Sequence, residues 1–399
     1  MDDLTRQPLK SRTLAAQAMG AGEATTKALV PPIHMSATYL RDPDNGYSAG
    51  YVYGRSDNAS VQQVEALLAA LEGAAEAMTF ASGMAAAAAV FMALEKPTHI
   101  VASRVMYWGF RSWLQKINRY GHSITFVETS ELQQVREAVR WGKTGLFWIE
   151  TPGNPLWTVT DIAAVSEIAH DAGALLCVDS TAATPVLTRP IALGADIVVH
   201  SATKYLNGHS DVVAGALATA RVSEFWERMR GVRTEIGAAL GPFDAWLLMR
   251  GMRTLDLRVR EQARTAALLA NRLVDHPAIS CVLYPGLSTH PGHDIALRQM
   301  AGGFGGMLSI RLKGGQAAAV ATAARVRVWR RATSFGGVES LIEHRASIEG
   351  SGTPCPVDLL RLSVGLEDPD DLYFDLVRAL DDFGEAHCIG FNPHPARLG

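Results

Sequence analysis

Between about residues 60 and 253 the chain alternates short apolar runs with stretches of helical periodicity. Residues 61–71 carry apolar side chains at the spacing of one helical face, with Ser60 as the expected N-cap and Gly73 as the stop. Residues 161–172 show the same periodicity. Five continuous apolar runs read as buried strands: 100–101, 124–127, 146–149, 175–178 and 197–199. Apolar strands separated by helices predict an α/β fold with a mostly parallel central sheet covered on both faces.

The pattern changes on both sides of this region. Residues 1–58 contain many turn-forming residues, which predicts an irregular arm that lies along a neighbouring subunit. Beyond residue 253 we expect a helix over 254–274, a glycine turn at 302–306, a strand over 307–312 and a helix over 369–383. These elements indicate a smaller α+β domain. The expected divisions are an arm, 1–58, a large domain, 59–253, and a small C-terminal domain, 254–399.

Composition narrows the class of protein. The 399 residues are 48% hydrophobic and 19% charged, as in a folded enzyme of two domains. A net charge of −3 predicts no nucleic-acid partner and no membrane-surface partner. The four cysteines lie at no metal-ligand or redox spacing, so we expect no metal site. The N-terminal residues lack the layout of a signal peptide, which favours a cytoplasmic protein.

Polar side chains follow several of the predicted strands, where ligands collect in open parallel sheets. Asp179 and Lys204 lie 25 residues apart, with one helix-like segment and one strand between them, so their strand ends can be neighbours. A buried ion pair is one interpretation of these two residues. Pyridoxal-5′-phosphate (PLP) enzymes offer another, because they need a lysine for the cofactor aldehyde, an acid for the ring nitrogen and donors for the phosphate. Ser82, Ser201 and Thr203 are candidate donors.

Several motifs, in their order along the chain, are similar to those of the Cys/Met-metabolism family of PLP-dependent enzymes, which includes cystathionine γ-synthases, cystathionine β- and γ-lyases and methionine γ-lyase. The resemblance covers residues 26–379 and implies the PLP-dependent transferase fold (fold type I, aspartate aminotransferase-like), with PLP as the cofactor. The matching motifs lie at residues 30–33, 53–56, 82–84, 150–155, 178–181, 201–211, 336–342 and 361–367.

The resemblance implies roles around the cofactor. Lys204 is expected to hold PLP as a Schiff base and to carry protons, and Asp179 to keep the pyridine nitrogen protonated. Tyr107 is expected to stack on the ring and to assist proton transfer. The residues expected to bind the phosphate are Ser82, Gly83, Met84, Ser201 and Thr203.

The same resemblance implies a substrate site and an assembly. Arg361 is expected to grip the α-carboxylate of an amino-acid substrate through two parallel hydrogen bonds. Tyr53 and Arg55 in the arm are expected to reach the cofactor phosphate of a neighbouring subunit in a homotetramer built from dimers. The other expected substrate contacts are Asn154, Thr333 and Ser334.

The positions that separate the reactions of the family depart from its usual patterns. Trp108 follows Tyr107 where the family carries glycine, and Thr333 stands where γ-lyases and γ-synthases usually place glutamate. These departures favour a lyase that eliminates a β- or γ-substituent, through a carbon–sulfur or other carbon–heteroatom bond, from an amino acid such as cystathionine. A γ-replacement enzyme of the cystathionine γ-synthase or O-acyl-homoserine sulfhydrylase type is the alternative.

Two other classes of protein fit fragments of the sequence. The S-x-x-K string at 201–204 and the K-T-G at 143–145 also occur in serine acyl enzymes, but their order along the chain is reversed. A non-catalytic PLP-fold binding protein is a distant alternative, and the presence of the lysine, the aspartate and the arginine argues against it. Arg111 and Arg345 are expected to form surface salt bridges, and contact with an anionic or polar distal group of the substrate is the alternative.

Overall fold

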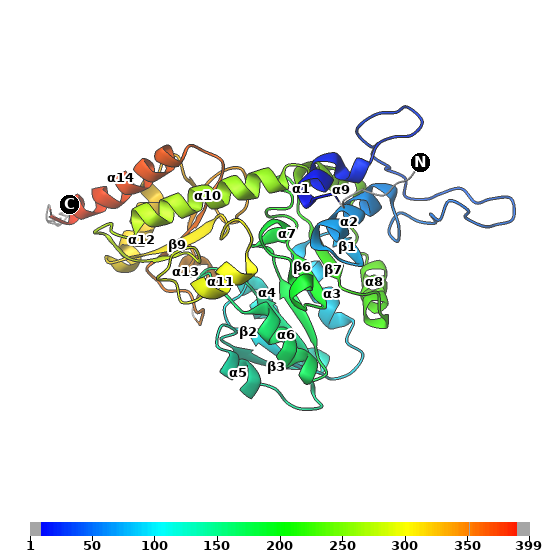
Figure 1. Ribbon diagram of the computed structural model, residues 1–399, viewed down its shortest axis with the longest axis horizontal. Coiled ribbons are helices and arrows are strands. Elements are labelled where there is room, and N and C mark those ends of the chain that lie inside the picture. The colour runs from blue at the N-terminus through cyan, green and yellow to red at the C-terminus, as the bar shows by residue number, and fades with distance from the viewer. Residues whose placement is uncertain (1–8, 351, 389–399) are drawn as a thin grey trace, which may run out of the picture.

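Two sheets organise the computed structural model of the protein, which describes residues 9–350 and 352–388 (Figure 1). The larger sheet has seven strands in the order β1-β7-β6-β5-β4-β2-β3. Strand β7 runs antiparallel to both of its neighbours, and the other neighbours pair in parallel. The strands are β1 Glu76–Phe80, β2 His99–Ser103, β3 Ser123–Val127, β4 Thr144–Glu150, β5 Leu175–Asp179, β6 Ile197–His200 and β7 Gly215–Thr219.

All five strands expected from the apolar runs are present in this sheet. The predicted central sheet, mostly parallel, is therefore confirmed. Strands β1 and β7 were not predicted, because neither contains a run of the branched apolar residues typical of strands: β1 reads EAMTF and β7 reads GALAT. Their antiparallel pairing fills the edge of the sheet beyond β6.

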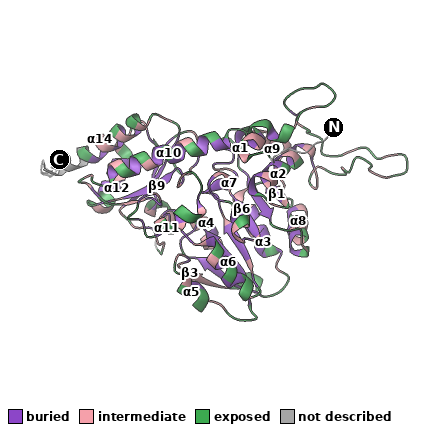
Figure 2. Cartoon of the chain, viewed as in Figure 1, coloured by how far each residue is buried: buried purple, intermediate pink, exposed green. Residues whose placement is uncertain are grey.

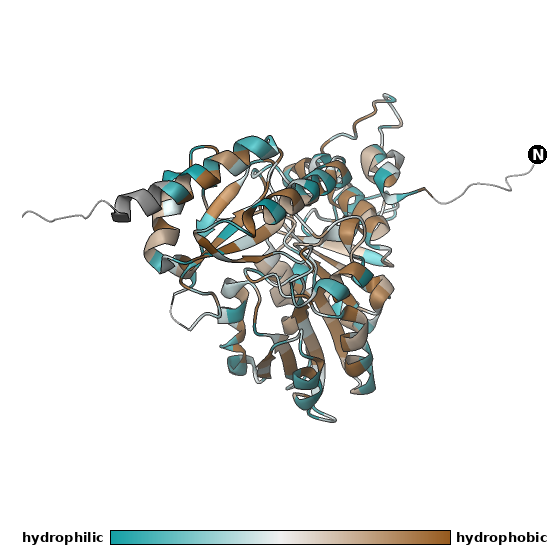
Figure 3. Ribbon diagram, turned by 60° about the vertical axis from the view of Figure 1, so that its left-hand side comes forward, coloured by the Kyte–Doolittle hydropathy of each residue, from teal (hydrophilic) through white to brown (hydrophobic). Residues whose placement is uncertain are grey.

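Helices cover both faces of the large sheet, and Figure 3 shows hydrophobic strands beneath helices with hydrophilic outer sides. Alternate residues of β6 face opposite layers: Val198 packs with α2 and α9, whereas Ile197 and Val199 pack with α3 and α8. These helices are α2 Ala59–Glu72, α3 Gly83–Met92, α4 Trp108–Leu114, α5 Leu132–Glu137, α6 Ile162–Asp171, α7 Thr184–Leu187, α8 Glu224–Ile236 and α9 Pro242–Met252.

The start of α2 differs from the sequence prediction. The side chain of Asn58 caps the helix by accepting the Ser60 N–H at 2.9 Å, and Ser60 itself lies inside the first turn. The Ser60 hydroxyl instead accepts the N–H of His34 in the arm at 3.0 Å. The predicted stop at Gly73 is confirmed, because this residue has the left-handed φ of 68° that favours glycine.

The second sheet has five strands in the order β10-β11-β12-β9-β8 and is mostly antiparallel. The long helix α10, the strand at 307–312 and the start of the last helix lie where the sequence predicted them, and the 302–306 segment turns through glycines at positive φ. The elements are α10 Leu255–Leu273, β8 Ile279–Leu283, α11 His293–Gln299, β9 Met307–Leu312, α12 Gly315–Arg325, β10 Arg330–Arg331, β11 Leu341–His344, α13 Ala346–Glu349, β12 Leu359–Ser363 and α14 Pro369–Cys388.

The N-terminal segment is only partly irregular. Helix α1, Ser11–Gln17, packs against the rest of the chain, and Ala15 and Ala18 are buried in the same apolar cluster as α2 and α9. Beyond it, most of the chain before Asn58 is exposed and forms loops that extend outward (Figures 1 and 2). Leu29 and Leu40 are 89% and 95% exposed there. Among the described residues, no helix has both the length and the apolar character needed to cross a bilayer.

Candidate active site

A cavity of about 460 Å³ lies where the carboxyl ends of β4, β5 and β6 meet the start of α3 and the edge of the second sheet. Most of the residues expected at the site come together here, although they are spread over nearly 300 positions of sequence. The expected residues that line the cavity are Ser82, Gly83, Met84, Tyr107, Asn154, Asp179, Ser201, Thr203, Lys204, Thr333, Ser334 and Arg361.

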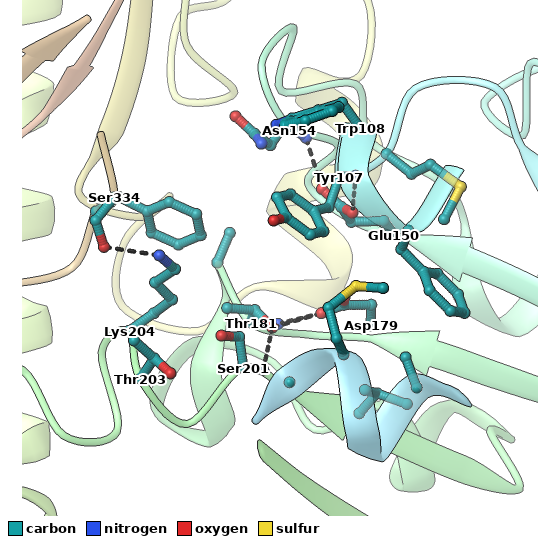
Figure 4. A pocket seen from close by; sticks show the side chains of 18 of the residues that line it. Tyr107, Trp108, Glu150, Asn154, Asp179, Thr181, Ser201, Thr203, Lys204 and Ser334 are labelled. Carbon is teal, nitrogen blue, oxygen red and sulfur yellow. Dashed lines mark hydrogen bonds between the residues drawn. The ribbon is translucent and has the colours of Figure 1, made fainter. Parts of the chain in front are cut away.

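Asp179 is the last residue of β5 and has one carboxylate oxygen held by the protein. Thr181 donates its backbone N–H and its hydroxyl to that oxygen at 3.0 and 2.6 Å, and the Thr181 hydroxyl in turn accepts the Ser201 N–H at 2.8 Å (Figure 4). The second oxygen has no hydrogen-bond donor within the described chain. Burial raises the pKa of Asp179, and the two Thr181 bonds oppose this. A protonated ring nitrogen fits this free oxygen, because it would supply the missing donor and a compensating charge.

The amino end of α3 faces the same cavity. The Ser82 hydroxyl caps the helix by accepting the Ala85 N–H at 3.1 Å, while the N–H groups of Gly83 and Met84 have no acceptor among the described residues. A Cβ on Gly83 would lie 3.0 Å from the Ser201 side chain, so glycine allows the helix end and this hydroxyl to approach closely. Free amides at a helix N-terminus beside a hydroxyl suit a phosphate group.

Thr203 lines the cavity, and its hydroxyl already has partners within the chain. Its hydroxyl donates to the Ala214 carbonyl at 3.1 Å and accepts the Ala214 N–H at 3.0 Å. Its single proton is therefore already used by the backbone that enters β7. The Ser201 hydroxyl forms no hydrogen bond within the described chain, so its proton is free to be donated to a ligand.

Lys204 follows β6 and projects into the cavity from the side opposite Asp179 (Figure 4). Its Nζ donates to the Ser334 hydroxyl at 2.7 Å and lies 5.3 Å from the centroid of the Phe335 ring. Burial, together with the positive charges of Arg361 and Arg345, lowers the pKa of Lys204 to about 8. An amine that loses its proton this easily can attack an aldehyde and accept a proton near neutral pH.

Glu150, the last residue of β4, joins two of the expected site residues. Its carboxyl group accepts the backbone N–H of Tyr107 at 2.7 Å and that of Asn154 at 2.9 Å (Figure 4). Burial and the nearby charge of Asp179 raise the pKa of Glu150 well above its usual value. Glu150 is the first residue of the motif at 150–155, but the sequence assigned no role to it. Its contacts fix the turn that carries Tyr107 against the loop that carries Asn154.

Arg361 occupies the other end of the cavity, on β12 of the second sheet. It donates to the Ser334 carbonyl at 2.8 Å, to the Asn154 side-chain carbonyl at 3.2 Å and to Glu343 at 2.5 Å. Burial, with the charge of Arg345, lowers the pKa of Arg361 to about 10, so it stays a cation at neutral pH. Ser334, with a φ of 92°, therefore contacts both Lys204 and Arg361.

The expectation of surface salt bridges for Arg111 and Arg345 is wrong. Arg345 is buried and pairs with Glu343 and Glu349, because the segment after β11 folds back over the second sheet. Arg111 donates to the Gly352 carbonyl at 3.2 Å and forms no ion pair within the described residues. Arg345 does line the cavity. Thr181, Glu343 and Glu349 were missed as contributors, and only Thr181 stood in a motif that could have pointed to it.

Tyr53 and Arg55 do not line the cavity of their own chain. They lie in the exposed arm, where the Arg55 guanidinium sits 5.7 Å from the centroid of the Tyr53 ring. Their expected contact with a neighbouring subunit stays a prediction.

The residues present fit PLP. Three kinds of group open onto one cavity, and each matches one part of the cofactor. The partly deprotonated lysine matches the aldehyde, and the carboxylate oxygen without a donor matches the ring nitrogen. The two helix-start amides without acceptors match the phosphate.

Comparisons with known proteins agree with this fit. The sequence model of the Cys/Met metabolism PLP-dependent enzymes matches residues 12–381. The cystathionine gamma-synthase of Mycobacterium tuberculosis is 45% identical over 376 residues, which cover 92% of this chain and 96% of the relative. The cystathionine gamma-lyase of Bacillus subtilis is 41% identical over 383 residues, which cover 94% and 100%.

The solved structures agree as well. The crystal structure of cystathionine gamma synthase from Xanthomonas oryzae pv. oryzae in complex with cystathionine has a TM-score of 0.90 to this chain at 36% identity, with 95% of this chain and 100% of that chain covered. The expected PLP-dependent transferase fold is thereby confirmed. Because the family match spans nearly the whole chain and the cavity suits the cofactor, we conclude that this protein is a PLP-dependent enzyme of the Cys/Met metabolism family.

Proposed function

We propose that this enzyme is a lyase that eliminates a γ-substituent, through a carbon–sulfur or other carbon–heteroatom bond, from an amino acid such as cystathionine. The observation that carries the proposal is that Lys204, Asp179 and Arg361 open onto one cavity. That arrangement offers a proton-transfer group, a partner for the cofactor ring and a binding group for a carboxylate. The choice of γ- over β-chemistry is supported by the names of two of the relatives, cystathionine gamma-synthase and cystathionine gamma-lyase.

The proposed roles follow from the contacts of each side chain. When bound, PLP supplies a ring that accepts electrons from bonds broken at the substrate α-carbon. Asp179 holds the ring nitrogen in its protonated form, and Thr181 keeps the carboxylate oriented. Lys204 would hold the cofactor through its aldehyde, and its amine would remove the proton from the substrate α-carbon. Departure of a γ-substituent requires a second proton removal, at the β-carbon, which we also assign to Lys204.

Substrate orientation is assigned to the other end of the cavity. Arg361, together with Asn154, binds the α-carboxylate, and Tyr107 covers the ring face. The Ser334 hydroxyl orients the Lys204 amine. The Gly83 and Met84 amides with the Ser201 hydroxyl bind the phosphate, and Thr333 contacts the part of the substrate beyond its β-carbon.

A γ-replacement reaction is the second candidate, supported by the 45% identity to a relative named as a synthase. The two reactions are distinguished by their products. The purified holoenzyme is incubated with cystathionine, and separately with an O-acyl-homoserine plus cysteine. Release of 2-oxobutyrate and ammonia from cystathionine supports γ-elimination. Faster formation of cystathionine from the second mixture supports replacement, pyruvate indicates β-elimination, and no turnover of either mixture overturns the proposal.

We also propose how the chain is organised and assembled. Residues 1–58 form an arm that contacts a neighbouring subunit, 59–253 the large domain and 254–399 the small domain of a homotetramer. The exposed apolar residues of the arm support this arrangement. A cytoplasmic location is supported by the three described cysteines, all of which are free thiols. If Arg55 reaches a neighbour's cofactor, Arg55→Ala should weaken PLP retention in a protein whose oligomeric state, measured by sedimentation, is unchanged.

A further inference from the structure

Four buried charges lie in a row behind the carboxylate-binding end of the cavity. The side chains of Arg361, Glu343, Arg345 and Glu349 are each at most 8% exposed and alternate in sign. Glu343 Oε2 accepts from Arg361 at 2.5 Å and from Arg345 at 3.0 Å, and Arg345 also donates to Glu349 at 2.9 Å. The row carries no net charge of its own, so each buried ion has a partner, as burial requires.

Two elements of the second sheet create this row. Glu343 on β11 and Arg361 on β12 are directly opposite each other in the antiparallel register. Cross-strand neighbours have Cβ atoms about 5 Å apart, close enough for a fixed ion pair. Arg345 lies at the start of α13 and Glu349 lies one turn later. This short helix therefore places the Arg345–Glu349 ion pair next to the Glu343–Arg361 pair.

Arg361 has five N–H groups in total. Three of them are used by Asn154, Ser334 and Glu343, and the remaining two have no acceptor within the described chain. Glu343 supplies the shortest of these bonds and the only negative charge among them. The direction in which the two remaining N–H groups point therefore depends on Glu343.

We propose that Glu343 is a positioning residue for this enzyme: it holds the Arg361 guanidinium in the orientation that binds the substrate α-carboxylate, and Arg345 and Glu349 hold Glu343. This inference rests on the proposed role of Arg361. It also assigns Arg345 a structural part, although Arg345 lines the cavity, because two carboxylates already neutralise its charge.

The test compares two ligands that differ only at the carboxylate. L-alanine has no leaving group, and L-alaninamide lacks the carboxylate that Arg361 would bind. The dissociation constants of both for the holoenzyme are measured at one pH from the change in the visible absorbance of the bound cofactor. The ratio of the two constants reports carboxylate recognition separately from cofactor loading and from turnover.

Two substitutions of Glu343 separate positioning from charge. Glu343→Gln keeps the shape and an acceptor but removes the charge, and Glu343→Leu removes both. If Glu343 positions Arg361, alanine binding weakens by about tenfold or more in Glu343→Leu and by less in Glu343→Gln, while alaninamide changes by less than about twofold. If only charge matters, both variants bind alanine more tightly, because a carboxylate near Arg361 has been removed.

The test also includes a control variant and separates failure of the Glu343 proposal from failure of the proposed role of Arg361. Glu339→Gln changes an exposed glutamate four positions earlier, which accepts the Ser210 hydroxyl at 3.2 Å, and should leave both constants unchanged. If the wild-type enzyme itself does not prefer alanine to alaninamide, the proposed role of Arg361 is wrong. If the wild type does prefer alanine, but Glu343→Gln binds it equally well or better, the positioning role is wrong even where Glu343→Leu does not fold.

Discussion

The two ends of the active-site cavity are built in different ways. At the cofactor end, strand ends and a helix start leave two amides and one carboxylate oxygen without a protein partner in the described chain. At the substrate end, Arg361 is held by three acceptors and backed by a row of paired charges. In the proposed roles, the cofactor end is complementary to a ligand that stays bound, whereas the substrate end has to remain ordered while substrates bind and leave. A long, buried arginine keeps one orientation only if the protein supplies partners for it.

The largest effect is expected from removing the proton carrier that lies between the two ends. Lys204→Ala should lower the rate of product formation by about 10³-fold or more, because both cofactor attachment and proton transfer depend on this amine. Product release is followed by assaying the 2-oxo acid. The wild type should also lose its visible absorbance on borohydride treatment with the cofactor attached covalently, and the variant should not. Activity above a tenth of the wild-type rate in the variant would contradict the mechanism.

The substrate end is tested by Arg361→Lys. Lysine keeps the positive charge but lacks the planar fork, so kcat/KM should fall by about 10²-fold, mainly through a higher KM. The dissociation constant for PLP should change little, because Arg361 donates no hydrogen bond to the groups proposed to hold PLP. Steady-state kinetics and PLP titration measure the two effects. An unchanged KM would mean that the carboxylate binds elsewhere.

The cofactor end is tested by Thr181→Val. This change removes the hydroxyl that donates to Asp179 and accepts the Ser201 N–H, so PLP should bind about tenfold more weakly. Equilibrium dialysis of PLP measures the change. Thr322→Val is the matched control, since the hydroxyl of this buried threonine has no hydrogen-bond partner in the described chain. Equal PLP affinity in Thr181→Val and wild type would remove Thr181 from the site.

The smallest expected effect is on the pH dependence of PLP capture, through which the charge of Arg361 at one end of the cavity acts on Lys204. Because the pKa of Lys204 is lowered to about 8, the apoenzyme should capture PLP faster as the pH rises from 7 to 9, following the neutral amine. Burial is the main cause and persists in Arg361→Met, whereas the repulsion from the Arg361 charge is lost there. The midpoint of the rate profile should therefore move to higher pH in that variant. Stopped-flow absorbance gives both profiles, and a midpoint that stays or moves lower would show that the two ends are not coupled.

The cofactor end was largely predictable from the sequence. Strands β2 to β6 are recognisable in the sequence as apolar runs. Because neighbouring parallel strands end at the same edge of a sheet, Asp179 and Lys204 come to one edge whatever the sequence of the segment that connects them. The resemblance to a known family then supplied the roles of Gly83, Met84 and Ser201. One local prediction was wrong: Asn58 rather than Ser60 caps α2, because the Asn58 side chain accepts the Ser60 N–H.

The substrate end depended on tertiary structure beyond Arg361 itself. Nothing in the sequence around Arg345 distinguishes it from an exposed arginine, and the pairing of Glu343 with Arg361 follows from a strand register that local patterns do not encode. The amino-acid sequence by itself determined the central sheet through its periodicity, and its motifs, through the family resemblance, indicated the cofactor and the lysine proposed to hold it. Only the tertiary structure decided which buried charges form pairs. A charged side chain that is removed from water needs an opposite charge or a hydrogen-bond partner, and the chain segment that packs against it supplies that partner.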